Sequence, residues 1–159
     1  MMKKNILVFL LLLSYFSLFS QSTNSKWSDL FSYNNVLAFK EKDGKIIAAT
    51  ENGVFYYNTI SGEITKLSKA NGLHEVKISA FDYDAATNTA IIGYKSGNLD
   101  VVTADGVTYV VDIPLSQSYT GSKTINNISI NGDKAVISVG YGVSIFNITK
   151  KEFGDTCFF

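Results

Sequence analysis

The sequence predicts an all-β fold, because one phrase of β-prone residues returns three times at a nearly constant interval. Each copy is an apolar run, a short turn and a second β-prone run. The three copies span residues 46–55, 90–99 and 135–144. Their glycines, Gly53, Gly97 and Gly142, lie 44 and 45 residues apart. A period of about 40–50 residues built from short strands is typical of β-propeller blades, which have four strands each. We therefore expect an incomplete β-propeller of about three blades of four antiparallel strands, with these glycines in equivalent positions.

Residues 1–20 have the composition of a signal peptide. Lys3 and Lys4 precede an apolar run over residues 6–13, and a serine-containing stretch then leads to the polar Gln21. A membrane anchor needs about 20 apolar residues, and this run is shorter. We expect export, cleavage near Gln21 and no transmembrane span in the mature chain, so that residues 21–159 form the propeller domain.

The strands of this domain are separated by turns with glycine. A leading strand is expected near residues 36–39, 81–83 and 128–130, ahead of each repeated phrase. The turn dipeptides Asp-Gly, Asn-Gly and Ser-Gly end at Gly44, Gly53, Gly62, Gly97, Gly106 and Gly132. Glycine accepts the positive φ that tight hairpins demand. The runs 46–49 and 90–93 are apolar without alternation, which indicates strands buried on both faces by neighbouring blades.

Past the second repeat the chain is expected to be irregular. Pro114 is the only proline, and it opens a polar stretch that reaches Lys123. We expect residues 116–123 to form a projecting loop and no long helix to follow Lys26. The chain stops inside an apolar run at Phe158 and Phe159, so we expect the N-terminal part of a longer propeller, truncated at its C-terminus.

Composition argues against nucleic-acid binding. All 14 basic residues are lysines, and without Lys3 and Lys4 the remaining 12 face 14 acidic residues. Arginine is the favoured residue for bidentate phosphate and base contacts, and a basic face is the usual footprint of nucleic-acid binding. The mature chain has a net charge near −2 and no arginine, so it lacks both the favoured residue for phosphate contacts and an overall basic character.

Few residues suit catalysis or metal binding. His74 is the only histidine and Cys157 the only cysteine, which removes histidine-pair metal sites and intrachain disulfides. We interpret His74 as a solvated loop residue and Cys157 as a small buried hydrophobe. Asp82 and Asp84 resemble loose calcium ligands, but a strand-to-turn cap explains them better. The sequence predicts no catalytic residue, no cofactor and no metal site.

Aromatic residues are abundant, with 21 in the chain. Most occur at strand positions, where packing between blades explains them. The functional alternative is a platform on which sugar rings stack. Its exposed candidates are Trp27, Tyr119 and Tyr141.

Several motifs resemble known propeller families. The segments 72–73, 78–84, 91–94 and 96–99 resemble the two-component-regulator propeller repeat, with a Gly-Leu pair, an Ile- and Asp-bearing strand and an Ile-Gly strand. Tyr94 replaces the threonine of that repeat, and no tryptophan stands in the third strand. A narrower likeness is carried by residues 27–35, 51–57, 92–98 and 152–156. These look like the N-terminal propeller of PorZ-type proteins, over residues 26 to 157.

This resemblance implies a non-catalytic subunit at the cell surface of a Gram-negative bacterium, in the type IX secretion system. The subunit would belong to the attachment complex that cleaves cargo sorting signals and joins cargo to anionic lipopolysaccharide. Its expected partners are other attachment-complex proteins and an anionic lipopolysaccharide or glycan, in the periplasm or on the outer surface. The end of the signal peptide, Phe19-Ser20-Gln21, also looks like those of Bacteroidetes.

Two alternatives stay open at this point. The periplasmic sensor propeller of a hybrid histidine kinase shares the repeat, and a transmembrane helix with a kinase domain further along the gene would favour it. A propeller enzyme acting on glycans would need convergent acid–base or metal-binding residues at the axis, and the three repeats contain none.

Overall fold

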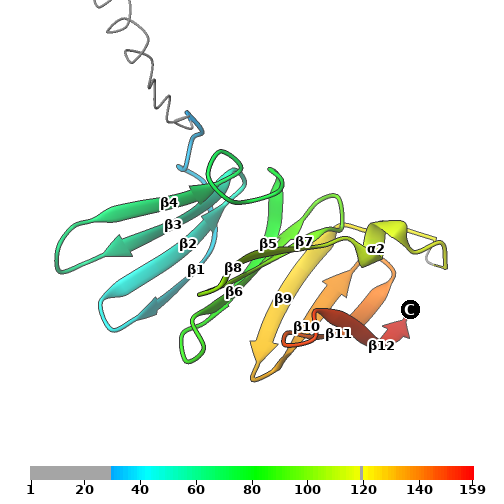
Figure 1. Ribbon diagram of the computed structural model, residues 1–159. Coiled ribbons are helices and arrows are strands. Elements are labelled where there is room, and N and C mark those ends of the chain that lie inside the picture. The colour runs from blue at the N-terminus through cyan, green and yellow to red at the C-terminus, as the bar shows by residue number, and fades with distance from the viewer. Residues whose placement is uncertain (1–29, 119) are drawn as a thin grey trace, which may run out of the picture.

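The computed structural model describes residues 30–118 and 120–159, which form three four-stranded antiparallel sheets (Figure 1). The first sheet has the order β1-β2-β3-β4, the second β5-β6-β7-β8 and the third β9-β10-β11-β12. Their bounds are β1 (Val36–Lys42), β2 (Lys45–Thr50), β3 (Gly53–Asn58), β4 (Ile64–Ser68), β5 (Ile78–Asp84), β6 (Thr89–Tyr94), β7 (Leu99–Thr103), β8 (Gly106–Val110), β9 (Ile125–Asn131), β10 (Lys134–Val139), β11 (Gly142–Asn147) and β12 (Glu152–Phe158). The sheets follow one another without closing a ring. The predicted three blades of an incomplete propeller are confirmed.

Tight hairpins join neighbouring strands within each sheet. Between β1 and β2, where Lys42 pairs with Lys45, the two loop residues Asp43 and Gly44 both have positive φ, 53° and 73°. Two central residues with positive φ define the turn whose twist matches that of the flanking strands. The Asp-Gly dipeptide therefore sets this hairpin, as its sequence predicts.

The core lies at the two interfaces between sheets. One cluster joins Ile47 and Val54 of the first sheet to Ala90, Ile92 and other residues of the second. The other cluster joins β6, β7 and β8 of the second sheet to the third, with Ile125, Ile137 and Phe146 buried there. Alternate residues along the strands of the second sheet thus pack against the first sheet and against the third sheet.

Burial follows the number of neighbouring sheets. Every residue of β6 is buried, because the second sheet has a sheet on each side. Strand β10 of the third sheet instead alternates, and Val136 on its outward face is 40% exposed. Burial on both faces explains the unbroken apolar run of β6, as the sequence predicts.

Polar contacts link the innermost strands of all three sheets. Oδ1 of Asp82 on β5 accepts from Nζ of Lys40 on β1 at 2.9 Å, and its Oδ2 accepts from the backbone N–H of Ile130 on β9 at 2.7 Å. Asp84 accepts from the backbone N–H of Ala86 and caps its turn. The cap interpretation holds for Asp84, whereas Asp82 has the further role of joining the sheets.

The structure contains one short helix, which the expectation of no long helix allows, and it corrects the expectation for Cys157. The segment that starts the irregular stretch contains one turn of helix, α2 (Asp112–Leu115), in which Pro114 is tolerated because first-turn N–H groups have no intrahelical partner. Cys157 is exposed instead of buried, because it lies on β12, the outermost strand of the third sheet. Within the described residues no helix is long and apolar enough to cross a membrane.

Candidate functional site

The three repeat glycines mark the same hairpin of each sheet but do not occupy one identical position. Gly53 and Gly142 are the first residues of β3 and β11. Gly97 lies in the preceding turn, with φ +93°, two residues before β7 begins. The turn of the second sheet is longer than the two-residue turns of the other sheets, which accounts for the offset.

These glycines have no room for a side chain. A Cβ on Gly142 would lie 2.1 Å from the carbonyl oxygen of Cys157, and a Cβ on Gly97 would lie 2.6 Å from that of Lys123. Both oxygens belong to the backbone of another segment. The glycines therefore allow close approach of two chain segments, in addition to any turn that they form.

Of the three aromatic candidates, the structure describes Tyr141. Trp27 and Tyr119 lie outside the described residues. Tyr141 is 7% exposed and packs against Phe158, with ring centroids 6.0 Å apart. It was expected to be exposed, but its turn folds against the edge of the third sheet. Tyr141 contributes to the wall of a cavity of about 380 Å³ that also involves Asp112 and Glu152.

The predicted loop is exposed along most of its length and anchored at both ends. The Nζ of Lys123 donates to the carbonyl oxygens of Pro114 and Ser116, at 2.8 Å each. The carbonyl of Ser122 accepts from the N–H of Gly140, in the hairpin of the third sheet. Gln117 and Ser118 between these anchors are exposed.

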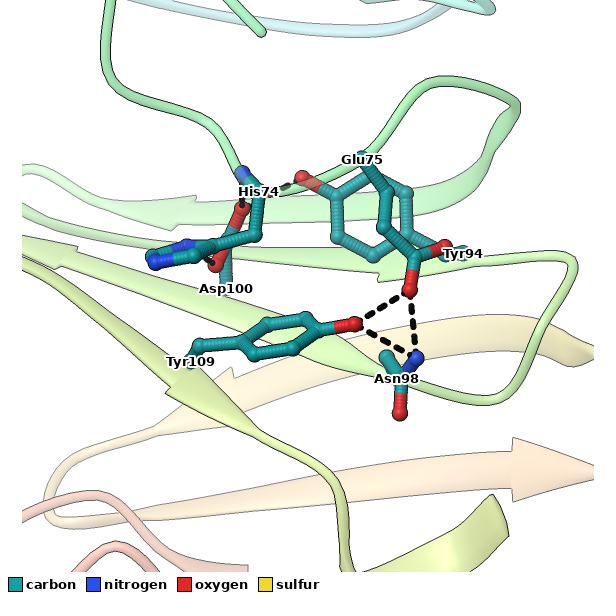
Figure 2. A network of polar contacts seen from close by, with 6 residues as sticks. All are labelled: His74, Glu75, Tyr94, Asn98, Asp100 and Tyr109. Carbon is teal, nitrogen blue, oxygen red and sulfur yellow. Dashed lines mark hydrogen bonds and ion pairs between the residues drawn. The ribbon is translucent and has the colours of Figure 1, made fainter.

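A polar network that the sequence did not reveal joins the segment between β4 and β5 to the second sheet (Figure 2). Asp100 of β7 is fully buried and accepts three hydrogen bonds. The donors are the hydroxyl of Tyr94 at 2.5 Å, the backbone N–H of His74 at 2.9 Å and the Nδ1 of His74 at 2.7 Å. Because a carboxylate only accepts, Nδ1 carries the proton and the imidazole is held in one orientation.

The second half of the network is centred on Glu75. Its carboxylate accepts from the hydroxyl of Tyr109, the amide of Asn98 and the hydroxyl of Ser96, the last at 2.7 Å. The ring of Tyr109 stacks on the imidazole of His74, with centroids 4.5 Å apart and planes 13° apart. Tyr109 therefore connects the two carboxylates, as Figure 2 shows.

The network shifts the protonation of its members. Burial, followed by the hydrogen bond to Asp100, raises the pKa of Tyr94 far above its ordinary value. Burial, followed by the hydrogen bond to Glu75, raises the pKa of Tyr109 to about 12. Burial alone would raise the pKa of Glu75, but the hydrogen bonds from Tyr109, Ser96 and Asn98 outweigh it and lower that pKa. Both tyrosines therefore remain donors and Glu75 remains an acceptor near neutral pH.

This arrangement serves to hold the segment in place. It attaches residues 74–75, which lead from the first sheet to the second, onto β7 and β8. The side chain of His74 is 42% exposed and lies in a loop, as the sequence predicts, but its Nδ1 also binds the buried Asp100. An aspartate inside the apolar run of β7 was the available signal, because a buried carboxylate requires partners. In the described part of the chain no cluster of three or more His, Cys, Asp or Glu side chains could hold a metal ion.

Comparison with known proteins identifies related propellers. A sequence model of the family described as "TSS9, PorZ, N-terminal beta-propeller domain" matches residues 46–159. No curated protein matches the chain.

Among solved structures, PorZ, described as an essential bacterial surface component of the type IX secretion system of Porphyromonas gingivalis, aligns with a TM-score of 0.72 and 22% identity. The alignment covers 82% of this chain and 18% of that one. The extracellular domain of a putative one-component system of B. thetaiotaomicron aligns with a TM-score of 0.64 and 14% identity, over 84% of this chain and 18% of that one. The chain thus spans less than a fifth of either structure, and these identities establish the fold alone.

Proposed function

Since the chain belongs to the PorZ N-terminal β-propeller family, we propose that it is part of a non-catalytic subunit of the type IX secretion attachment complex. The family match over residues 46–159 is the observation that carries this proposal. The subunit acts in an extracytoplasmic location, at the outer cell surface, where it binds partners while cargo sorting signals are processed.

The polar chemistry of the chain supports binding over catalysis. The His74–Asp100 pair resembles a catalytic dyad in its 2.7 Å contact, but its other contacts are with the Tyr94 hydroxyl, the ring of Tyr109 and the backbone N–H of His74. A hydrolase would also need a nucleophile and donors aimed at the developing oxyanion. The contacts of this pair instead join two segments of the fold.

Partner contacts are proposed at the end of the sheets that carries the glycine hairpins. The exposed part of the loop over residues 116–123 is next to the hairpin of the third sheet, where the carbonyl of Ser122 accepts from the N–H of Gly140. Trp27 and Tyr119 are proposed to contribute aromatic contacts to the partner, whereas the buried ring of Tyr141 is not. Propellers present loops of successive blades together, so one large partner can contact several repeats. The partners are other attachment-complex proteins or an anionic lipopolysaccharide, which lysines would hold in the absence of arginine. Such binding weakens with added salt.

A second candidate is the sensor propeller of a two-component system. It is favoured by the fold likeness to the extracellular domain of the B. thetaiotaomicron one-component system, at a TM-score of 0.64. A sensor would transmit ligand binding to a transcriptional response instead of acting on secreted cargo.

Deletion of the gene in its native host distinguishes the two candidates. The secretion proposal predicts that cargo retains its sorting signal and is no longer attached to the surface, as measured by mass spectrometry of cell-envelope and medium fractions. Normal cargo processing together with loss of a transcriptional response to extracellular glycans would overturn it in favour of the sensor. Complementation with the wild-type gene is the control.

A further inference from the structure

A cavity of about 690 Å³ lies between the first and second sheets. Its wall on the first sheet includes Tyr56 and residues of the β1–β2 and β3–β4 hairpins, and its wall on the second sheet includes Tyr83, Ala90 and Val102. The cavity is at the end of the sheets opposite the glycine hairpins. Its volume is within the range of about 300–1,000 Å³ typical of small-molecule sites.

The repeat itself explains why this interface is hollow. In the second sheet, Ala90 pairs with Tyr83 on one side and Val102 on the other. The equivalent residue of the third sheet, Ala135, pairs with Ile130 and Phe146. Phe146 is fully buried and fills the second interface. Valine at the same position of the second sheet leaves the corresponding space in the first interface open.

Two tyrosines supply aromatic surface within this space. Burial, followed by the neighbouring Tyr83, raises the pKa of Tyr56, and burial, followed by Asp84, raises the pKa of Tyr83. Both hydroxyls therefore stay protonated near neutral pH. The hydroxyl of Tyr83 also donates to Oδ1 of Asn88 at 2.9 Å, which fixes the two side chains relative to each other.

Two amides are held so that they can donate. Oδ1 of Asn58 accepts from the backbone N–H groups of Ile60 and Ser61, and Oδ1 of Asn88 accepts from Tyr83. Both side chains line the cavity. Because their oxygens are engaged, the amide N–H groups are what they offer to a ligand.

The charges around the cavity cancel. Lys42 and Lys45 are balanced by Asp43 and Glu63. An anionic ligand would face two carboxylates, and a cationic ligand two ammonium groups. A hydroxyl-rich neutral ligand, whose groups both donate and accept, can use the carboxylates, the ammonium groups and the amides together.

We propose that this cavity is a binding site for a short neutral oligosaccharide, with sugar faces against Tyr56 and Tyr83 and sugar hydroxyls on the surrounding polar groups. This inference does not depend on the proposed function, because it concerns a different end of the sheets and an uncharged ligand. Failure of cargo sorting in the deletion strain and sugar binding in vitro can therefore be tested separately.

The test uses the full chain with cellotriose, chitotriose and mannotriose as neutral probes and a trimer of galacturonate as the anionic probe. Saturation-transfer NMR detects binding, and calorimetry gives the dissociation constant. We expect at least one neutral trisaccharide to bind and the galacturonate trimer to bind at least about tenfold more weakly. Tyr56→Ala should weaken the neutral sugar about tenfold, through loss of ring contact.

Val102→Phe is the sharpest variant, because it introduces the residue that fills the equivalent position of the third sheet. It should abolish sugar binding while leaving the melting temperature unchanged or higher. The matched control is Val136→Phe, the same substitution on an exposed position of β10, which should bind like the wild type. The proposal is overturned if no neutral trisaccharide binds, if the galacturonate trimer binds best, or if folded Val102→Phe binds as well as the control.

Discussion

Replacing Asp100 with alanine should be among the most destabilising single changes in the second sheet. Asp100 is fully buried, and it accepts hydrogen bonds from the Tyr94 hydroxyl and from two groups of His74. Hydrogen bonds to a charged group contribute about 1.5–3 kcal/mol each, and a buried donor left without an acceptor costs about 1–3 kcal/mol. His74 is partly exposed and can bond to water, whereas the Tyr94 hydroxyl is enclosed. We therefore expect Asp100→Ala to lower the free energy of unfolding by about 3–5 kcal/mol.

Tyr94→Phe should cost less, about 1–2 kcal/mol, because the carboxylate keeps its two bonds from His74. Urea unfolding at pH 7, followed by circular dichroism, measures both variants, and an unchanged slope shows that the comparison is valid. A loss below about 1 kcal/mol for Asp100→Ala, or a greater loss for Tyr94→Phe than for Asp100→Ala, would refute the idea that Asp100 organises this segment.

Three further outcomes follow from the geometry. Gly142→Ala should lower the melting temperature far more than Gly62→Ala. Both glycines have positive φ, but a Cβ on Gly142 would meet the Cys157 carbonyl, whereas a Cβ on Gly62 would meet nothing within 4 Å. Equal decreases in melting temperature would contradict this. The pKa of Glu75 is lowered in the folded protein, so the ionised carboxylate stabilises the fold at pH values above 4.5, the ordinary pKa of a glutamate. This stabilisation is lost as the pH falls below that value. Glu75→Gln should therefore reduce the acid-side slope of the melting temperature, and an unchanged slope would count against the network. The exported protein should begin near Gln21, probed by N-terminal mass spectrometry, and a retained leader would contradict cleavage.

The sequence predicts the repeat architecture because turns and apolar runs are local signals. The hairpin at Gly44 and the buried run of β6 both follow from residues that are adjacent in the chain. The position of Gly97 could not be predicted from the spacing alone. The turn between β6 and β7 has four residues, whereas the equivalent turns of the other sheets have two, and this moves Gly97 out of line with Gly53 and Gly142. The spacing of glycines cannot distinguish a strand residue from a turn residue.

The polar network was missed because its partners are distant in sequence. Asp100 and His74 are 26 residues apart, and Glu75 and Tyr109 are 34 apart. Burial of Asp100 shows that a partner is required, but which partner depends on how the segment before β5 crosses β7. The burial of Tyr141 could not be predicted for a similar reason. The side chain of a turn residue can point to solvent or onto its own sheet, and for Tyr141 the contact with the distant Phe158 determines the orientation.

Photo-crosslinking at the cell surface tests the proposed binding function most directly. A photoreactive residue at Gln117, in the exposed loop, is compared with one at Thr87, in the exposed hairpin at the other end of the second sheet. In the native host, the account predicts that Gln117 crosslinks to proteins of the attachment complex, identified by mass spectrometry, and that Thr87 does not. Crosslinking from neither position, or capture of a histidine kinase in place of attachment proteins, would contradict it.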